Sequence, residues 1–308
     1  MNNRLTVVTL EQLLDISFPP REEILAPIIT TQSLTMLHAW RGIGKTHLVL
    51  GAAHAISTGS SFLKWSAPSP SGILYLDGEM PGIVLQERLE AIVAASGKEP
   101  PPGYFRIATP DLQKNGVMPD LSTQDGQSLV DEMVTPETKL IIVDNVSCLC
   151  RTGKENESEG WIPVQGWALR QRAMGRAVLF VHHSGKSGEQ RGASKREDTL
   201  DTVIKLVRPA EYEPSQGAAF EIVFEKARFL KGADVSGFEA RLTINQDTEL
   251  QEWVVQDLAQ SSYERVVALA NDGFSQAEIA VELGLHKSNV SRNLKKAAEQ
   301  GLLSLRST

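Results

Sequence analysis

The chain has 308 residues, of which 41% are hydrophobic and 22% charged, a balance typical of a globular protein with a sizeable core. No apolar run approaches the roughly 18 residues needed to cross a bilayer, and the N-terminus has no basic segment followed by an apolar one, so we exclude a transmembrane protein and expect a cytoplasmic one without an export signal. A formal net charge of -7 excludes a protein that coats nucleic acid with its whole surface, so any nucleic-acid contact must be local.

Short apolar runs alternate with amphipathic or alanine-rich stretches between residues 33 and 207. This alternation predicts strand-helix units and a largely parallel sheet. Three further runs are separated only by Gly/Asp turns, which predicts antiparallel strands that extend one edge of that sheet. The expected strands are 33–39, 72–78, 139–145, 177–183 and 201–207 in the parallel part, and 220–229, 238–244 and 252–256 in the antiparallel part.

The pattern changes after residue 255. The run QDLAQSS at 256–262 is predicted to be a linker, and residues 263–308 have the spacing of three helices, with no strand pattern before the last few residues. We therefore predict an α/β core over 1–255, with a short N-terminal extension, and a small all-α domain over 263–308.

The run A-W-R-G-I-G-K-T follows the first expected strand and precedes a helical pattern. It matches the P-loop G-x-x-x-x-G-K-[ST] except that Ala39 replaces the first glycine, which matters only if that residue needs a positive φ or very close phosphate approach. In a P-loop, backbone N–H groups surround the phosphates, the lysine meets the β and γ oxygens, and the hydroxyl holds Mg²⁺. The alternative is a chance glycine turn before a helix. We predict an ATP site formed by Ala39, Trp40, Arg41, Gly42, Ile43, Gly44, Lys45, Thr46 and His47.

Two carboxylates follow expected strands. Asp144 ends the run LIIVD and is predicted to hold Mg²⁺ through water together with Thr46, although such an Asp can also cap the next helix. Glu79 follows the strand 72–78, which we expect beside the P-loop strand, and it is predicted to polarise the water that attacks the γ-phosphate. Its alternative role is a helix N-terminal carboxylate before Pro81.

These motifs, together with the segment VLFVHHSGKSGEQRGASKREDTLDTVIKL, resemble the RecA-type core of replicative helicases, in particular the plasmid RepA helicases and more distantly the DnaB group. The resemblance covers residues 25–244. It implies that Glu79 is the catalytic base, that Asp144 is the Walker B aspartate, and that His182 or His183 senses the γ-phosphate. Without the resemblance, the two histidines would be interpreted as packing residues at a strand end.

A basic, glycine-rich loop follows the histidines, at 184–198. Its position suits a contact to the backbone of single-stranded DNA that changes with the nucleotide, and the alternative is a solvated charged loop. The resemblance implies that this loop lines the channel of a ring, and a second loop, 151–160, could join it. The basic residues concerned are Lys186, Arg191, Lys195 and Arg196.

A K-x-R pair ends the run FEKAR. In RecA-type ring helicases a pair at this place reaches the γ-phosphate of the neighbouring subunit, so the resemblance implies a trans arginine finger at Arg228 with Lys226 beside it. The spacing alone is too common to indicate this.

Residues 275–303 have the pattern of a helix-turn-helix, with an N-cap Ser275, a short helix, Gly284 at the turn and a second helix from about Lys287. Ala280 and Val290 lie where such a unit needs a small and a buried β-branched residue. AAEQGLL is typical of how a winged version leaves its recognition helix, and the alternative is a three-helix module for protein contacts. The side chains expected to meet duplex DNA are Lys287, Ser288, Asn289, Ser291, Arg292, Lys295 and Lys296.

Together these features predict a Mg²⁺-dependent ATPase that forms a ring, most simply a hexamer, and acts as a replicative DNA helicase of a plasmid, phage or other mobile element. One alternative is an ATP-switched loader or recombination-type protein that binds DNA without unwinding it. Another is a helix-turn-helix transcriptional regulator whose P-loop only senses nucleotide.

Overall fold

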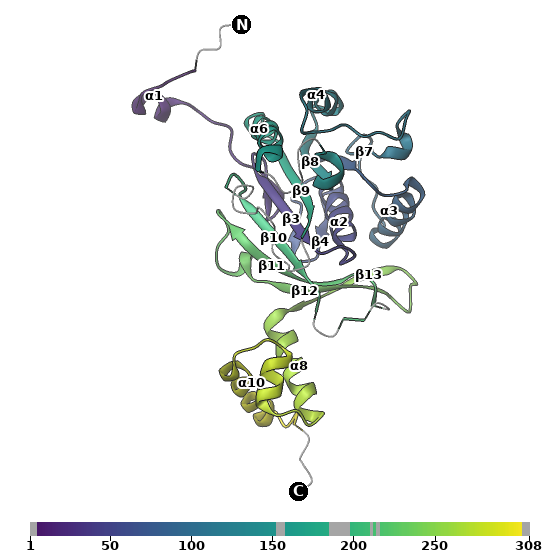
Figure 1. The fold of residues 1–308 in the computed structure, drawn as a ribbon, viewed down its shortest axis with the longest axis vertical. Helices are drawn as coiled ribbons and strands as arrows, with labels where there is room; N and C mark the ends of the chain where they lie inside the picture. The colour runs from purple at the N-terminus through teal and green to yellow at the C-terminus, as the bar shows by residue number, and fades with distance from the viewer. Residues whose placement is uncertain (1–4, 152–157, 185–197, 210–211, 214–215, 304–308) are drawn as a thin grey trace.

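The computed structural model describes residues 5–151, 158–184, 198–209, 212–213 and 216–303. Within these residues, nine strands form one mixed sheet in the order β13-β12-β11-β10-β3-β9-β8-β6-β7 (Figure 1). The strands are β3 (Leu34–Ala39), β6 (Gly72–Asp77), β7 (Phe105–Ala108), β8 (Thr138–Asp144), β9 (Ala177–His183), β10 (Thr202–Val207), β11 (Ala219–Ala227), β12 (Phe238–Ile244) and β13 (Gln251–Asp257).

The strands from β10 to β7 are parallel, and those inside the edge strand β7 are buried on both faces, which is why they are nearly continuous apolar runs. Alternate residues enter two cores. Tyr75 and Ile142 face the core beneath α2 (Lys45–Thr58) and α3 (Gly82–Ser96), whereas Leu76 and Val143 face the core beneath α4 (Gln124–Met133), α5 (Val146–Leu149) and α6 (Ser158–Ala173). The predicted α/β class with a mostly parallel sheet between helices is confirmed.

The antiparallel edge is also confirmed. Strand β11 pairs antiparallel with β10, β12 with β11, and β13 with β12. The expected strand positions therefore all appear, and in the predicted orientation.

One neighbour relationship was wrong. Strand β6, which ends two residues before Glu79, is not beside the P-loop strand β3, because β9 and β8 lie between them. The sequence pattern identifies strands but not their order in the sheet. The edge strand β7 was also not predicted, because three of its four residues are only half-buried and the strand follows a proline-rich turn.

Smaller elements complete the core. Strand β1 (Glu23–Leu25) pairs with β2 (Ile29–Thr30), and β4 (Ser61–Phe62) pairs with β5 (Trp65–Ser66). The 3-10 turns η1 (Pro110–Leu112) and η3 (Gly232–Val235) follow β7 and β11. At the N-terminus, the short helix α1 (Leu10–Asp15) lies away from the rest of the molecule (Figure 1). No helix in the described part of the chain is long and apolar enough to cross a membrane.

The C-terminal region consists of α8 (Leu258–Asn271), α9 (Gln276–Glu282) and α10 (Lys287–Glu299), around a small core of Val266, Ile279, Ala280 and Val290. Helix α8 starts immediately after β13, so the residues expected to form a linker at 256–262 belong to the end of a strand and the start of a helix. Arg265 of α8 donates to Glu221 on β11 and to the buried Glu239 on β12. The last five residues, where a wing could begin, lie outside the described ranges.

Candidate active site

The P-loop connects the end of β3 to the start of α2 and depends on two glycines. Gly42 and Gly44 have φ of +73° and +117°, a region that favours glycine. A Cβ on Gly44 would also lie 2.9 Å from the Cβ of Ala218. Ala39, by contrast, is an ordinary strand residue paired with His183. The first motif position therefore does not need the backbone freedom of glycine, whereas the other two do.

A cavity of about 340 Å³ opens beside this loop at the carboxyl edge of the parallel strands. It is bounded by the N-terminus of the 14-residue helix α2, where free backbone N–H groups favour an anion. The lining comes from segments far apart in sequence: Gly42, Gly44, Lys45, Thr46, His47, Glu79, Arg88, Asp144, His183, Tyr212, Gly217 and Ala218.

Lys45 lies at the centre of this arrangement. Its Nζ donates to the carbonyl oxygens of Ala39 and Trp40, at 3.1 Å each, and lies 2.9 Å from Nδ1 of His183. The side chain is 5% exposed, and burial lowers the pKa of Lys45 to about 8, opposed by the charges of Asp144 and Glu79. An ammonium group held beside the loop in this way is placed to meet phosphate oxygens.

Asp144 ends β8 and is almost fully buried. Tyr75 donates its hydroxyl to Oδ2 of Asp144 at 2.5 Å. Burial is the largest cause that raises the pKa of Asp144 to about 6, and the nearby carboxylates of Asp77 and Glu79 add to it. Because Thr46 and Asp144 both line the cavity with oxygen atoms, the residues present fit Mg²⁺, which prefers oxygen ligands.

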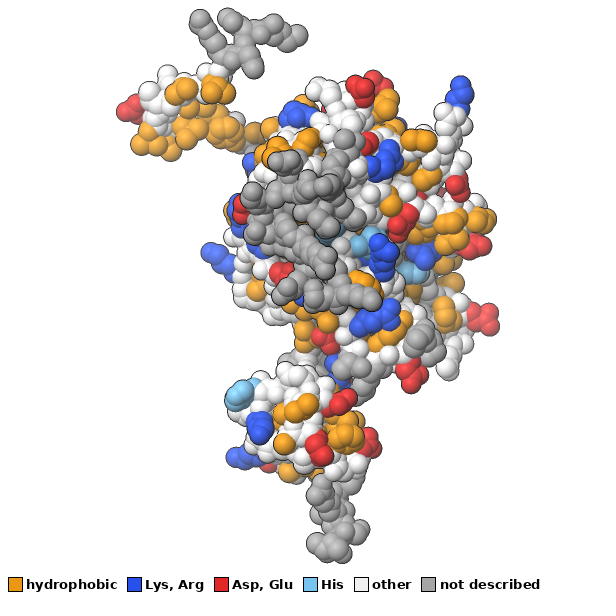
Figure 2. All heavy atoms as spheres, in the orientation of Figure 1, with side chains coloured by type: hydrophobic (Ala, Val, Ile, Leu, Met, Phe, Trp, Pro, Cys, Tyr) orange, Lys and Arg blue, Asp and Glu red, His pale blue; other side chains and the backbone are white. Residues whose placement is uncertain are grey.

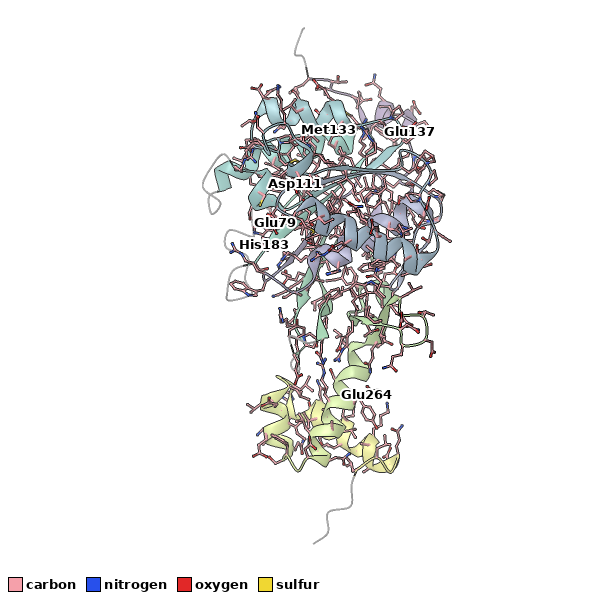
Figure 3. The ribbon with its side chains drawn as sticks, turned by 90° about the vertical axis from the view of Figure 1, so that its right-hand side faces the viewer. Glu79, Asp111, Met133, Glu137, His183 and Glu264 are labelled. Carbon is pink, nitrogen blue, oxygen red and sulfur yellow. The ribbon has the colours of Figure 1, made fainter. Side chains whose placement is uncertain are left out.

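Glu79 and His183 approach each other from different strands (Figure 3). Nε2 of His183 lies 3.8 Å from Oε1 of Glu79 and 3.1 Å from Nδ2 of Asn145. His183 therefore lies between Lys45 on one side and Glu79 on the other. His182 is buried, does not line the cavity, and pairs in register with His38. Of the two candidate sensors, the structure brings only His183 to the site.

The predicted P-loop residues divide into those that line the cavity and those that do not. Gly42, Gly44, Lys45, Thr46 and His47 line the cavity. Ala39 and Trp40 contribute carbonyl oxygens to Lys45, whereas Arg41 is exposed and Ile43 is buried in the core, neither of them lining the cavity.

Several cavity residues were not predicted. Arg88 reaches the cavity from α3. Burial is the main cause that lowers the pKa of His47 to about 4, and the charge of Arg88 adds to it. Arg208 donates to the carbonyl oxygen of Gly42 at 2.9 Å and lies 3.9 Å above the ring of Tyr212. The hydroxyl of Tyr212 donates to Gly217. None of these residues belongs to a short motif, so only the folded sheet could identify them.

Lys226 and Arg228 do not join the cavity of their own chain. Thr202 pairs with both Ala227 and Thr35, which places the end of β11 at the amino edge of the sheet, opposite the P-loop. Arg228 is exposed and donates to the carbonyl oxygen of Asp198 at 2.6 Å. A role in its own ATP site is therefore excluded by position.

The predicted DNA contacts have two outcomes. Lys186, Arg191, Lys195 and Arg196 lie outside the described residues, as does most of the loop 151–160.

In the helix-turn-helix, Ser275 caps α9 in a capping box with Glu278. Gly284 has a φ of +61°, and α10 begins at Lys287 as expected. Figure 2 shows lysine and arginine side chains on this C-terminal unit. The seven α10 side chains predicted to meet DNA are all exposed: Lys287, Ser288, Asn289, Ser291, Arg292, Lys295 and Lys296.

A family model described as an AAA domain matches residues 3–189, and one described as the MarR family matches residues 266–308. No curated protein matches the chain. Among solved structures, a KaiC-like protein from the hyperthermophilic archaeon Pyrococcus horikoshii OT3 is similar, with a TM-score of 0.48 and 11% identity over 75% of this chain and 93% of that one. The RadB recombinase is similar with a TM-score of 0.48 and 17% identity, over 72% of this chain and 90% of that one.

Proposed function

Because the chain belongs to the family described as an AAA domain, we propose that it is a Mg²⁺-dependent ATPase that assembles into a ring, most simply a hexamer, and acts as a replicative DNA helicase of a plasmid, phage or other mobile element. The observation that carries the proposal is the meeting of Lys45, Glu79, Asp144 and His183 at one cavity beside the P-loop. In this proposal Lys45 is the positive charge that meets the phosphate and Glu79 is the proton acceptor. Asp144 is the metal ligand, and His183 is the group that contacts Lys45.

Binding begins with the P-loop. The N–H groups at the start of α2 and the ammonium of Lys45 take the phosphate oxygens, and Lys45 exchanges its bonds to the carbonyls of Ala39 and Trp40 for them. Thr46 and Asp144 would hold Mg²⁺, which neutralises charge on the phosphate oxygens when bound. Tyr212, which lines the cavity and stacks against Arg208, would offer an aromatic side chain to the base.

Hydrolysis requires a proton acceptor near the γ-phosphate. The carboxylate of Glu79 lines the cavity and is about half exposed, so a water molecule can reach it. In this role Glu79 accepts the proton of the attacking water.

His183 is the proposed sensor. It contacts Lys45 and lies near Glu79, so replacing the bonds of Lys45 by bonds to phosphate changes the partners of His183. Ser184 follows it and opens the basic loop that we propose to contact single-stranded DNA through Lys186, Arg191, Lys195 and Arg196.

The C-terminal helices are a separate DNA-binding unit in this proposal. The match to the MarR family over 266–308 and the exposed basic side chains of α10 support duplex binding, with α10 as the recognition helix.

Strand displacement on a forked duplex tests the helicase assignment. ATP-dependent displacement supports it. ATP-dependent ring or filament formation on DNA without displacement would instead support the loader or recombination-type alternative. ATP binding without turnover would support a nucleotide-sensing regulator.

A further inference from the structure

Residues 5–18 form an arm that leaves the core and carries helix α1 at a distance from it (Figure 1). Thr9 and Gln12 form a capping box, so the sequence specifies a helix at this place. None of its residues is buried, and Leu10, Leu13 and Leu14 are 71%, 45% and 74% exposed. Their spacing of three and four residues places them on one face. A helix of six residues is not stable alone in water, so this face requires a surface to pack against.

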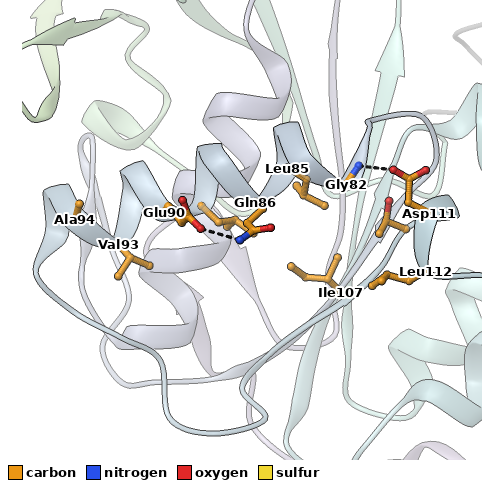
Figure 4. Close-up of a pocket in the computed structure, with 11 residues that line it drawn as sticks. Gly82, Leu85, Gln86, Glu90, Val93, Ala94, Ile107, Asp111 and Leu112 are labelled. Atoms are coloured by element: carbon orange, nitrogen blue, oxygen red, sulfur yellow. Dashed lines mark hydrogen bonds between the residues drawn. The ribbon is translucent and has the colours of Figure 1, made fainter.

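A matching surface lies on the other side of the molecule. A groove of about 660 Å³ runs between α3 and the strand β7 with its turn η1 (Figure 4). Its apolar lining includes Leu85, Leu89, Val93 and Ile107, and Leu112 beside them is 74% exposed.

The polar groups at the rim of the groove already have partners. Asp111 accepts from the backbone N–H of Gly82 at 2.7 Å, and Gln86 donates to Glu90 at 2.8 Å (Figure 4). The groove is therefore suited to apolar side chains spaced along one face of a helix.

The arm cannot fill the groove of its own chain. Gln32 donates to the carbonyl oxygen of Pro19, and Arg21 donates to that of Thr31, so the arm is attached to the core from residue 19 onward, next to the start of β3. The three residues 16–18 that remain span at most about 10 Å, and Leu14, at the near end of α1, can therefore lie at most about 13 Å from the attachment point. Four strand spacings of about 4.8 Å, roughly 19 Å in all, separate β3 from β7. Helices α1 and α3 also lie on opposite sides of the sheet's width (Figure 1).

We propose that α1 of one copy of this chain packs into the α3–β7 groove of the next copy, with Leu10, Leu13 and Leu14 as the anchoring side chains. The contact joins two different surfaces on opposite sides of one molecule, so it is head-to-tail and repeats from copy to copy. Such contacts form a closed ring or an open filament. The inference deepens the proposed function and rests on its assembly step.

Sedimentation velocity of the full chain with ATP and single-stranded DNA tests this contact. The arm variant carries Leu10→Ser, Leu13→Ser and Leu14→Ser, and the groove variant carries Val93→Glu and Leu112→Glu. All five positions are at least partly exposed, so folding should be preserved and circular dichroism checks it. The matched control is Val281→Ser, which removes an exposed apolar side chain from α9.

We expect the wild type and the control to assemble, and each variant alone to sediment as a monomer. An equal mixture of the two variants should form a two-chain species. The intact groove of the arm variant can bind the intact arm of the groove variant, and neither partner then has an intact surface left to add a third copy. A mixture without this species, or an arm variant that assembles like the wild type, overturns the inference while leaving the ring proposal intact. A wild type that stays monomeric overturns the ring proposal as well.

Discussion

Lys45 and His183 are in direct contact: Nζ of the P-loop lysine lies 2.9 Å from Nδ1 of the histidine that ends the neighbouring strand β9. The same histidine lies 3.8 Å from Glu79, two strands further along the sheet. One imidazole thus connects the proposed phosphate-binding group with the proposed proton acceptor. Separate substitutions of these residues should distinguish binding from hydrolysis.

Lys45→Ala should lower ATP turnover by roughly a hundredfold or more, because the phosphate loses its buried cation. Turnover is measured with a coupled assay and binding by titration with a fluorescent ATP analogue. Lys139→Ala is the control, since it removes a lysine paired with Glu22 on the surface. Ordinary turnover by Lys45→Ala would remove the basis of the P-loop assignment.

Glu79→Gln should retain ATP binding and lose turnover by about a hundredfold to ten-thousandfold, because the amide keeps the shape of the side chain but cannot accept the proton. Binding and single-turnover hydrolysis are measured separately. Loss of binding would show that Glu79 maintains the shape of the cavity instead.

The ATP association constant should fall as the pH rises through about 8. Burial has lowered the pKa of Lys45 to about that value, so the free protein loses the ammonium charge above it, whereas phosphate favours the charged form. Binding is measured from pH 7 to 9.5. In Lys45→Arg, whose side chain does not titrate in this range, the profile should be flat, and an equal decline in both proteins would exclude Lys45 as the cause.

Arg228→Ala should fold, assemble and bind ATP but hydrolyse it poorly, since a trans arginine can be worth about a thousandfold in turnover. Its position at the edge opposite its own P-loop means that any part it takes in hydrolysis must be in another subunit's site. Mixed with Lys45→Ala, it should regain activity that neither variant shows, because some interfaces then combine an intact finger and an intact loop. Mixed rings that remain inactive would refute the shared site.

Arg265→Ala should destabilise the protein by about 2–3 kcal/mol, because the substitution removes two charged hydrogen bonds, one of them to the buried Glu239. Denaturant unfolding measures the change, and Arg292→Ala on the exposed face of α10 is the control.

Because Arg265 anchors α8 to the sheet, a deletion that tests the helix-turn-helix should begin after Asn271, not at residue 263. That deletion should abolish preference for a specific duplex site while leaving DNA-stimulated ATPase activity.

The sequence predicted the parts of the site that depend on local patterns. Gly42, Gly44 and Lys45 belong to one loop whose spacing follows from phosphate geometry, and Asp144 ends a buried strand. Arg88 and Tyr212 were missed because they reach the cavity from α3 and from the segment before β11, and no spacing relates them to the loop. The order of strands was missed for the same reason, since residue periodicity records burial and not which strand lies beside which.

The attachment of α8 has a mechanical consequence. Ala218 lies against Gly44 of the P-loop, and Glu221, three residues further along the chain on β11, accepts from Arg265. Three residues of strand span about 10 Å, and β11 is held between β10 and β12. A shift of the P-loop against Ala218 is therefore expected to displace Arg265 at the base of the helix-turn-helix. If the proposed ring forms, we expect the orientation of α10 in each subunit to follow the nucleotide state of that subunit's own phosphate cavity.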